Sequence, residues 1–336
     1  MTQAGFADVA VAALQPLAHQ GVAHDHIRIG GLKALMRVPR LSQFRLEPRA
    51  NLAYQAQCFA RAEASQRTPH LIGIIQPGRG VEHGALIVEE IEGSPPLLPS
   101  DLQALAETFA VVHGLALPPP ALRPPLADHP DAVAGTLGFI EAQAPYLERA
   151  VTNRAARRQI EAELAWAREF ADTVRGREQP QALVLTDAHP GNFLVDRRGR
   201  AIFVDLEKAV YGSPAADLAH ASLYTSTLWD RRVAAVLTRD EVGDFYRRYL
   251  SHIGRRPAAA LAPWLMPFRR LIWLRTTSWC ARWAVLSAEP GSDWSAAALP
   301  ADLIAYTRSR IADFFAPATI ERIRSEWLAE ELDFRS

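Results

Sequence analysis

The stretch Leu185-Thr-Asp-Ala-His-Pro-Gly-Asn192, with Val204-Asp-Leu206 shortly after it, is the part of this 336-residue chain that decides its fold. It places an acid at Asp187, an amide at Asn192 and a second acid at Asp205. The hydrophobic residues before the first acid predict a strand, and the Pro-Gly pair predicts a turn. Three oxygen-bearing side chains are therefore expected around one short loop.

The segment after this loop predicts a β-hairpin. Two short apolar runs, 193–195 and 201–204, flank a polar turn centred on Arg198-Gly199. With that turn, Asn192 lies opposite Asp205, and opposed side chains on one face of a hairpin have Cβ atoms about 5 Å apart. An amide oxygen and a carboxylate at that separation could share one Mg²⁺, a hard ion that prefers oxygen ligands. The first acid of the loop is then free to face a substrate hydroxyl, a division of labour that matches phosphoryl transfer.

The same region resembles the aminoglycoside phosphotransferase and choline kinase-like superfamily in three pieces, which occur in the family's order and spacing. These pieces are Thr186-Asp-Ala-His-Pro-Gly-Asn192, Val204-Asp-Leu-Glu207 and Gly212-Ser-Pro-Ala-Ala-Asp-Leu-Ala219. The resemblance implies an α+β, two-lobed protein-kinase-like fold. A small mixed N-lobe would occupy residues 1–92 and bind nucleotide, and a larger, mainly helical C-lobe would occupy residues 93–336.

The resemblance also implies an activity, namely ATP-dependent transfer of the γ-phosphate to a hydroxyl of a small molecule, with ATP and Mg²⁺ as cofactors. Asp187 would be catalytic, and Asn192 and Asp205 would hold the metal. Asp217 would brace the catalytic loop. His189 would either contact phosphate or form a structural hydrogen bond, and the second role is favoured because buried polar groups need partners.

The N-terminal segment contains the expected nucleotide-binding residues. Ala34–Pro39 resembles the family strand that presents a cation to the phosphates, which makes Arg37 the expected ligand and Lys33 the alternative. The segment Leu86–Ile91 resembles the hinge strand of the family, where the main chain at Glu89 and Ile91 would meet the adenine ring. ATP and GTP are not distinguished by these residues.

Two features depart from the family pattern. The helix residue expected to pair with Arg37 is Gln55, which cannot neutralise a guanidinium, and Glu47 or Glu63 could take its place. Gly30-Gly31 is a poor candidate for a phosphate-covering loop, and a plain hairpin turn is preferred. These departures are the reason to keep one alternative function, a non-catalytic kinase-like protein that binds a ligand or partner, although all three residues of the loop motif are present.

The acceptor is expected to be a small molecule. Only residues 206–211 separate Asp205 from the next predicted helix, which is too short for the activation segment of a protein kinase. Residues 217–300 contain eleven Arg, no Lys and seven acidic residues, so neutral or anionic hydroxylated metabolites fit better than a polycation. Oligomeric state is not indicated.

Several side chains after the motif are candidates for the acceptor pocket. The aromatic residues could form a cage for a quaternary amine, although aromatic residues at helical spacing are more often core. These aromatic candidates are Trp273, Trp279 and Trp283, and the polar candidates are Glu207, Tyr224 and Asp230.

Composition narrows the class of protein. The chain is 49% hydrophobic and 22% charged, with a formal net charge of zero, which argues against general attraction to nucleic acid or membranes. Only Cys58 and Cys280 are present, which allows one disulfide bond but excludes a metal site made of several cysteines. Neither a signal-peptide pattern nor a long apolar run is found, and a cytoplasmic protein is expected.

Overall fold

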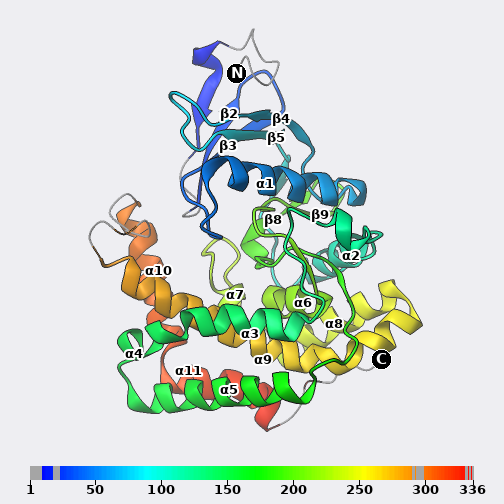
Figure 1. Cartoon of the computed structure of the whole chain (residues 1–336), viewed down its shortest axis with the longest axis vertical. Coiled ribbons are helices and arrows are strands. Elements are labelled where there is room, and N and C mark those ends of the chain that lie inside the picture. The colour runs from blue at the N-terminus through cyan, green and yellow to red at the C-terminus, as the bar shows by residue number, and fades with distance from the viewer. Residues whose placement is uncertain are drawn as a thin grey trace.

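The structure is a computed structural model that describes residues 10–17, 23–289, 292, 299–329, 332 and 334. An antiparallel sheet and one helix form the N-terminal lobe, and a larger, mainly helical C-terminal lobe follows (Figure 1). This arrangement confirms the predicted α+β, two-lobed fold.

The N-terminal sheet has five antiparallel strands in the order β1-β2-β3-β5-β4. The strands are β1 (Leu14–Pro16), β2 (His24–Ile29), β3 (Ala34–Pro39), β4 (Leu71–Ile75) and β5 (Ala85–Glu89). One face buries an apolar cluster that includes Ile29, Met36 and Ile87. Residues 30–33 form the turn between β2 and β3, in which Gly31 has φ 79°, so the preferred hairpin turn is confirmed.

Helix α1 (Pro48–Ala62) lies between this sheet and the helical lobe (Figure 1). Its proline stands in the first turn, where the missing amide hydrogen costs nothing. Leu52 and Phe59 are buried on its inner side, and the hydroxyl of Tyr54 donates to the Ala209 carbonyl oxygen of the C-terminal lobe at 2.8 Å. Helix α1 is therefore part of the N-terminal lobe in sequence and is bonded to the C-terminal lobe through Tyr54.

The C-terminal lobe is built around the long helix α9, which packs against α3 and α6. Its helices are α2 (Leu102–His113), α3 (Ala132–Gln143), α4 (Leu147–Ala150), α5 (Arg154–Thr173), α6 (Pro214–Ser222), α7 (Tyr224–Thr227), α8 (Arg239–Ile253), α9 (Arg255–Leu286), α10 (Ala301–Phe314) and α11 (Pro317–Leu328). Short 3₁₀ turns are η2 (Val11–Ala13), η3 (Glu63–Ser65), η4 (Pro120–Leu122), η5 (Ala144–Tyr146) and η6 (Pro190–Asn192).

Five short strands of this lobe surround the motif region, in a two-stranded and a three-stranded sheet. They are β6 (Gly93–Ser94), β7 (Ala182–Val184), β8 (Phe193–Asp196), β9 (Ala201–Phe203) and β10 (Val210–Gly212). Strand β6 leaves the hinge and pairs with β8. A lobe boundary at residue 92 stays a prediction.

The hairpin between β8 and β9 has a loop one residue longer than predicted. Arg197-Arg-Gly199 connects the strands, and Gly199 is left-handed at φ 74°. Asp196 stabilises this loop, because its Oδ1 accepts from the amides of Arg198 and Arg200 at 2.8 and 3.0 Å. A turn closed by a left-handed glycine is a common three-residue connection. The predicted two-residue turn is wrong.

The additional loop residue shifts the register of the hairpin. Phe193 pairs with Phe203, and the Val204 amide donates to the Asn192 carbonyl oxygen at 2.9 Å. Asn192 therefore lies opposite Val204 and not opposite Asp205. The predicted cross-strand pair of amide and carboxylate does not form, although Asp205 directly follows the residue that is bonded to Asn192.

A continuous apolar core joins the hairpin to the helices behind it. Phe109 of α2 is fully buried, and its ring lies 5.4 Å from that of Phe193 and 6.3 Å from that of Phe245. Cys58 and Cys280 are both buried and free, which answers the question of a disulfide. Within the described residues, no helix is both long and apolar enough to cross a membrane.

The aromatic cluster gives a stability prediction. Phe109→Ala should lower the free energy of unfolding by about 3–5 kcal/mol, because it removes a buried ring and leaves a cavity. Val111→Ala, on the exposed side of the same helix, should change it by less than about 1 kcal/mol. Urea unfolding followed by circular dichroism measures both, and equal losses in the two variants would contradict the assigned core.

Candidate active site

The motif loop begins directly after β7. The Asp187 amide donates to the Leu185 carbonyl oxygen at 2.9 Å, and η6 turns the chain back into β8. Asn192 Nδ2 donates to the Asp187 carbonyl oxygen at 2.8 Å. This bond fixes the orientation of the amide and leaves Asn192 Oδ1 free of it. The structure therefore brings two of the predicted residues together.

Thr186 adopts a backbone conformation that β-branched residues rarely take. Its φ is 64°, in the left-handed region that favours glycine. Its amide donates to Asp217 Oδ1 at 2.8 Å, and its hydroxyl donates to the Lys208 carbonyl oxygen at 2.7 Å. Its carbonyl oxygen accepts from Arg275 Nη1 at 2.9 Å. Three neighbours thus hold the strained residue in place.

Asp217 of α6 has the bracing role predicted from the sequence. Its side chain is completely buried, and Oδ2 accepts from the Leu185 amide at 2.6 Å. His113 Nε2 lies 3.1 Å from the same carboxylate, and His113 Nδ1 lies 3.0 Å from the Tyr249 hydroxyl. A buried carboxylate is stable only with such partners.

Lys208 is a residue of the site that sequence reasoning missed. Its Nζ lies 2.5 Å from Asp187 Oδ2 and 3.7 Å from Glu207 Oε1. Burial alone would raise the pKa of the Asp187 carboxyl, but the Lys208 ammonium holds that pKa below its usual range. One signal was available: the whole sequence contains only two lysines, Lys33 and Lys208, among 37 basic residues.

Arg37 of β3 reaches across to the other lobe. Only 4% of it is exposed, so it is not a solvent-facing residue at the edge of a strand. Its Nη1 donates to the Val204 carbonyl oxygen at 2.7 Å, and its Nη2 pairs with the Asp205 carboxylate. Lys33, the alternative cation, is exposed and pairs with Glu92 at 2.9 Å. The geometry favours Arg37.

Gln55, which stands where the family pattern predicts a carboxylate, has a different partner from the one expected. Gln55 is buried and its Oε1 lies 3.0 Å from His24 Nε2, so it does not contact Arg37. Glu63 pairs with the exposed His70, and no ion pair joins Arg37 to Glu47 or Glu63 within the described chain. Asp205 and a backbone carbonyl replace the helix carboxylate as partners of Arg37.

Glu207, a pocket candidate, lies in a buried polar group between the lobes. It accepts from Gln43 Nε2 at 2.8 Å, and His24 Nδ1 lies 3.5 Å from its carboxylate. Burial, together with the charge of Asp205, raises the pKa of Glu207 to about 7. Burial and the charge of Arg37 lower the pKa of His24 to about 3. Ligand atoms of His24, Asp205 and Glu207 lie within 4.8 Å of one another, close enough to hold a metal ion.

The hinge segment follows β5. The Glu89 amide donates to the His70 carbonyl oxygen, and the Glu90 amide donates to that of Lys33, both at 2.9 Å. Within the described residues, no hydrogen bond engages the amide of Ile91. This main chain can therefore offer a donor to a ligand.

His189 is buried, but its ring makes no hydrogen bond within the described residues, and its Nδ1 has no partner. The favoured structural hydrogen bond is therefore absent. The ring of His220 lies 6.2 Å away at 79°, and its Nδ1 is likewise without a partner. Burial lowers the pKa of both imidazoles, to about 3 for His220, so both are neutral near pH 7.

The proposed aromatic cage is wrong. Trp273 and Trp283 are buried in the core, where Trp273 packs 5.9 Å from Trp327. Both side chains lie on the side of α9 that packs against neighbouring helices. Of the three tryptophans, only Trp279 is partly exposed.

The two remaining pocket candidates already have partners. The Tyr224 hydroxyl donates to Asp313 at 2.9 Å. Asp230 pairs with Arg232 at 2.5 Å and lies so close to Gly191 that a Cβ there would come within 2.6 Å of it. Asp230 therefore supports the turn before Asn192.

Comparison with known proteins gives a family. The model of the phosphotransferase enzyme family matches residues 20–253, and the chain belongs to this family. No protein among the curated sequences matches it.

Solved structures show the same fold. A choline/ethanolamine kinase family protein from Mesorhizobium loti is 17% identical, with a TM-score of 0.59 over 95% of this chain and 94% of that one. A Plasmodium vivax ethanolamine kinase is 12% identical, with a TM-score of 0.62 over 95% and 86%. The GDP complex of aminoglycoside 2'-phosphotransferase-IIIa is 14% identical, with a TM-score of 0.58 over 93% and 96%. At these identities the likeness establishes the protein-kinase-like fold.

The strain at Thr186 gives the second prediction. Thr186→Gly should change the free energy of unfolding by no more than about 1 kcal/mol, because relief of the left-handed strain offsets the lost hydroxyl bond. Thr186→Val keeps the strain and leaves the Lys208 carbonyl oxygen without its partner, so it should cost about 1–3 kcal/mol. Urea unfolding distinguishes them, and a glycine variant as unstable as the valine variant would contradict the strained conformation.

Proposed function

We propose that this protein is a Mg²⁺- and ATP-dependent phosphotransferase that acts on a hydroxyl of a small molecule. The observation that carries the proposal is the convergence of Asp187, Asn192 and Asp205 with a buried cation of the other lobe, Arg37. Family membership supports phosphoryl transfer in general.

Asn192 and Asp205 would hold the metal. The bond from Asn192 Nδ2 to a backbone oxygen leaves Oδ1 as a free oxygen donor, and Asp205 adds a carboxylate. Such a donor set suits Mg²⁺, which prefers oxygen ligands and completes its shell with water and phosphate. When bound, the ion supplies charge neutralisation on the phosphates.

Asp187 would orient the acceptor hydroxyl and receive its proton. A carboxylate whose pKa is held low is a weak base, so orientation is its main contribution. Phosphoryl transfer through a loose transition state needs little base strength and depends on positioning and charge. Lys208 holds Asp187 ionised and places an ammonium beside the point of transfer.

Nucleotide contacts would come from both lobes. Arg37 is suited to the phosphates because its planar guanidinium offers several donors in fixed geometry. His189, with an unpartnered nitrogen, could donate to a phosphate oxygen. The main chain at Glu89 and Ile91 would meet the adenine ring. The lobes would divide near residue 92.

A small-molecule acceptor is supported by the chain after Asp205. Residues 206–209 lead directly into β10, and α6 follows it at Pro214. This leaves no segment that could order a protein substrate. A cytoplasmic location fits such an enzyme.

A non-catalytic binding protein is the second candidate, and a specific observation favours it. Both carboxylates that would take part in catalysis already have cationic partners, Lys208 for Asp187 and Arg37 for Asp205. Gln55 does not hold Arg37 away from Asp205. In this alternative, the ion pairs close the site and no phosphate is transferred.

Calorimetric titration tests the nucleotide site. Mg·ATP should bind the wild-type protein with a Kd about 10- to 100-fold lower than that of Asp205→Asn, the range found when supporting groups of metal sites are removed. Binding to wild type should weaken similarly without Mg²⁺. Asp172→Asn, on an exposed helix surface, is the control and should bind as wild type does. A folded wild type that binds no nucleotide would contradict the site.

Turnover tests the catalytic roles. Asp187→Asn should lower kcat at least about 10²-fold, and Lys208→Met about 10²- to 10³-fold, because each removes a group that acts at the point of transfer. Mg·ATP affinity should stay within about threefold in both. ATP consumption coupled to product formation measures kcat. Absence of turnover in a wild type that binds Mg·ATP would favour the non-catalytic alternative.

A further inference from the structure

We propose that His24, Asp205 and Glu207 form a second metal site, which binds a divalent transition-metal ion such as Zn²⁺ between the two lobes. Such a site does not require that the protein transfers phosphate, so it goes beyond the proposed function. It shares the Asp205 carboxylate with the proposed Mg²⁺ site, but it adds a nitrogen ligand that Mg²⁺ does not need.

The three side chains converge from distant parts of the chain. His24 begins β2 of the N-terminal lobe, and Asp205 and Glu207 follow β9 of the C-terminal lobe. One ligand atom from each residue lies within 4.8 Å of the other two. His24 and Glu207 are buried, whereas 23% of the Asp205 side chain is exposed. The cluster is therefore largely enclosed but can be reached by an ion from the side of Asp205.

The imidazole of His24 is oriented as a metal ligand. Its Nε2 lies 3.0 Å from Gln55 Oε1, an oxygen that can only accept, so Nε2 carries the proton. In the neutral ring, Nδ1 then has a lone pair. Histidines that bind metals in proteins almost always donate their other N–H to an oxygen in this way. Gln55 thereby fixes the tautomer that presents Nδ1 as a ligand atom.

Nδ1 of His24 faces a second acceptor. Glu207 Oε2 lies 3.5 Å from it, and within the described residues no other group is bonded to this oxygen. Two buried acceptors that face each other without a proton between them are unfavourable, and a positive ion bound to both would satisfy them. Two ligands of a tetrahedral metal, with bonds of about 2.1 Å, are about 3.4 Å apart. The observed separation matches such a pair.

Each carboxylate of the cluster has one oxygen left for an ion. Asp205 pairs with Arg37 through Oδ1, and in the described part of the chain no hydrogen bond or ion pair engages its Oδ2. Glu207 accepts from Gln43 through Oε1, and Lys208 Nζ lies 3.7 Å from that same oxygen. The two nearby cations thus leave Oδ2 and Oε2 unoccupied by charge. An ion bound to these oxygens and to the imidazole would have three protein ligands, and water would complete its shell.

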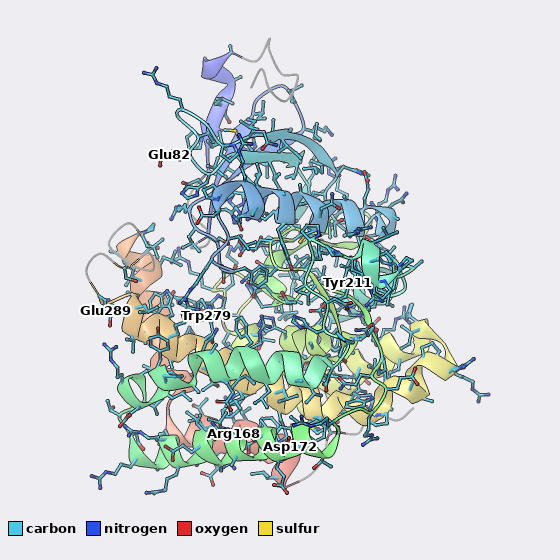
Figure 2. All side chains as sticks on the ribbon, viewed as in Figure 1. Glu82, Arg168, Asp172, Tyr211, Trp279 and Glu289 are labelled. Atoms are coloured by element: carbon cyan, nitrogen blue, oxygen red, sulfur yellow. The ribbon has the colours of Figure 1, made fainter. Side chains whose placement is uncertain are left out.

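Helix α1, whose glutamine bonds His24, also holds the segment after Glu207. The Tyr54 hydroxyl of this helix donates to the Ala209 carbonyl oxygen at 2.8 Å. Figure 2 shows Tyr211, in the strand that follows, on the side of α1 that faces the C-terminal lobe. One helix therefore positions both sides of the cluster, and the ligands need little rearrangement to bind an ion.

The ligand set favours a transition metal over Mg²⁺. Imidazole nitrogen suits Zn²⁺ and similar ions, whereas Mg²⁺ prefers oxygen ligands and gives up its water reluctantly. Three protein ligands with one position left for water are typical of zinc sites that are open to solvent. A bound ion would join β2 to the segment after β9, so it should also stabilise the folded protein.

Calorimetric titration of Zn²⁺ in the absence of nucleotide tests the site. Wild type should bind Zn²⁺ with a Kd at least about tenfold lower than its Kd for Mg²⁺. His24→Gln and Glu207→Gln should each raise the Kd for Zn²⁺ about 10- to 100-fold and change that for Mg²⁺ less than about threefold. Asp205→Asn should weaken the binding of both ions, because this carboxylate is common to both sites.

His26→Gln is the matched control. His26 lies two residues further along the same strand, and its ring is 6.2 Å from that of His24, but it is not part of the cluster. This variant should change neither Kd. Circular dichroism shows whether each variant is folded, and Zn²⁺ should raise the Tm of wild type and of His26→Gln but not that of His24→Gln.

Proton NMR of the wild-type protein with bound Co²⁺ tests the assigned nitrogen without relying on a variant. Co²⁺ bound to Nδ1 of His24 shifts the proton on Nε2 far outside the ordinary spectral range. The shifted signal should be present in wild type and should be lost after exchange into D₂O, because the proton is exchangeable. His24→Gln should lack the signal.

The outcomes separate this metal site from the proposed function. An equal Kd for Zn²⁺ in wild type, His24→Gln and Glu207→Gln would overturn the site, and a proton shared by the two side chains would then explain their approach. Absence of the shifted signal in Co²⁺-loaded wild type would overturn it too. Mg·ATP binding can persist in both cases. A wild type that binds Zn²⁺ through His24 but binds no Mg·ATP would instead keep the site and contradict the proposed function.

Discussion

The site depends on one buried carboxylate, that of Asp217. A charge without access to solvent is tolerated only when partners satisfy it, and here two backbone amides and His113 do so. Because those amides belong to Leu185 and Thr186, the carboxylate fixes the residues that precede Asp187. Thr186 is held in a left-handed conformation as a result, and its carbonyl oxygen is presented to Arg275. The direction of the motif loop thus follows from the hydrogen bonds of a single buried acid.

A second constraint is the balance of charge between the lobes. Arg37 is anchored by the Asp205 carboxylate and the Val204 carbonyl oxygen, both supplied by the chain after β9. With these partners, a helix carboxylate at position 55 is not required to hold the guanidinium. Gln55 instead bonds His24, whose other nitrogen lies beside Glu207. The neutral substitution that raised doubt about catalysis is thereby part of a buried polar chain between the lobes.

The sequence predicted the fold and the composition of the loop, because local signals decide both. These signals extend over only a few residues each. They are the spacing of the polar residues, the Pro-Gly turn and the short apolar strands, and the structure contains all three. The predicted register of the hairpin was wrong because two interactions favour a three-residue turn. Asp196 accepts hydrogen bonds from two amides of its own loop, and Gly199 adopts φ 74°. The ion pair of Lys208 with Asp187 joins residues 21 positions apart, and no rule of sequence spacing predicts such a pair. Burial of Trp273 and Trp283 was decided by neighbouring helices, which periodicity alone does not identify.

The number of arginines in the C-terminal lobe does not by itself define a basic pocket. The eleven arginines of residues 217–300 suggested a basic pocket, but several of them are occupied elsewhere. Arg269 is fully buried against Glu326, and Arg270 pairs with Glu163, so both stabilise helix packing and cannot meet a ligand. The acids near the motif loop differ in their partners: Lys208 pairs with Asp187 and Arg37 pairs with Asp205, whereas Asp217 is held by two backbone amides and His113. A count of arginines therefore does not identify a binding site, because only the contacts of each guanidinium show which of them a ligand could reach.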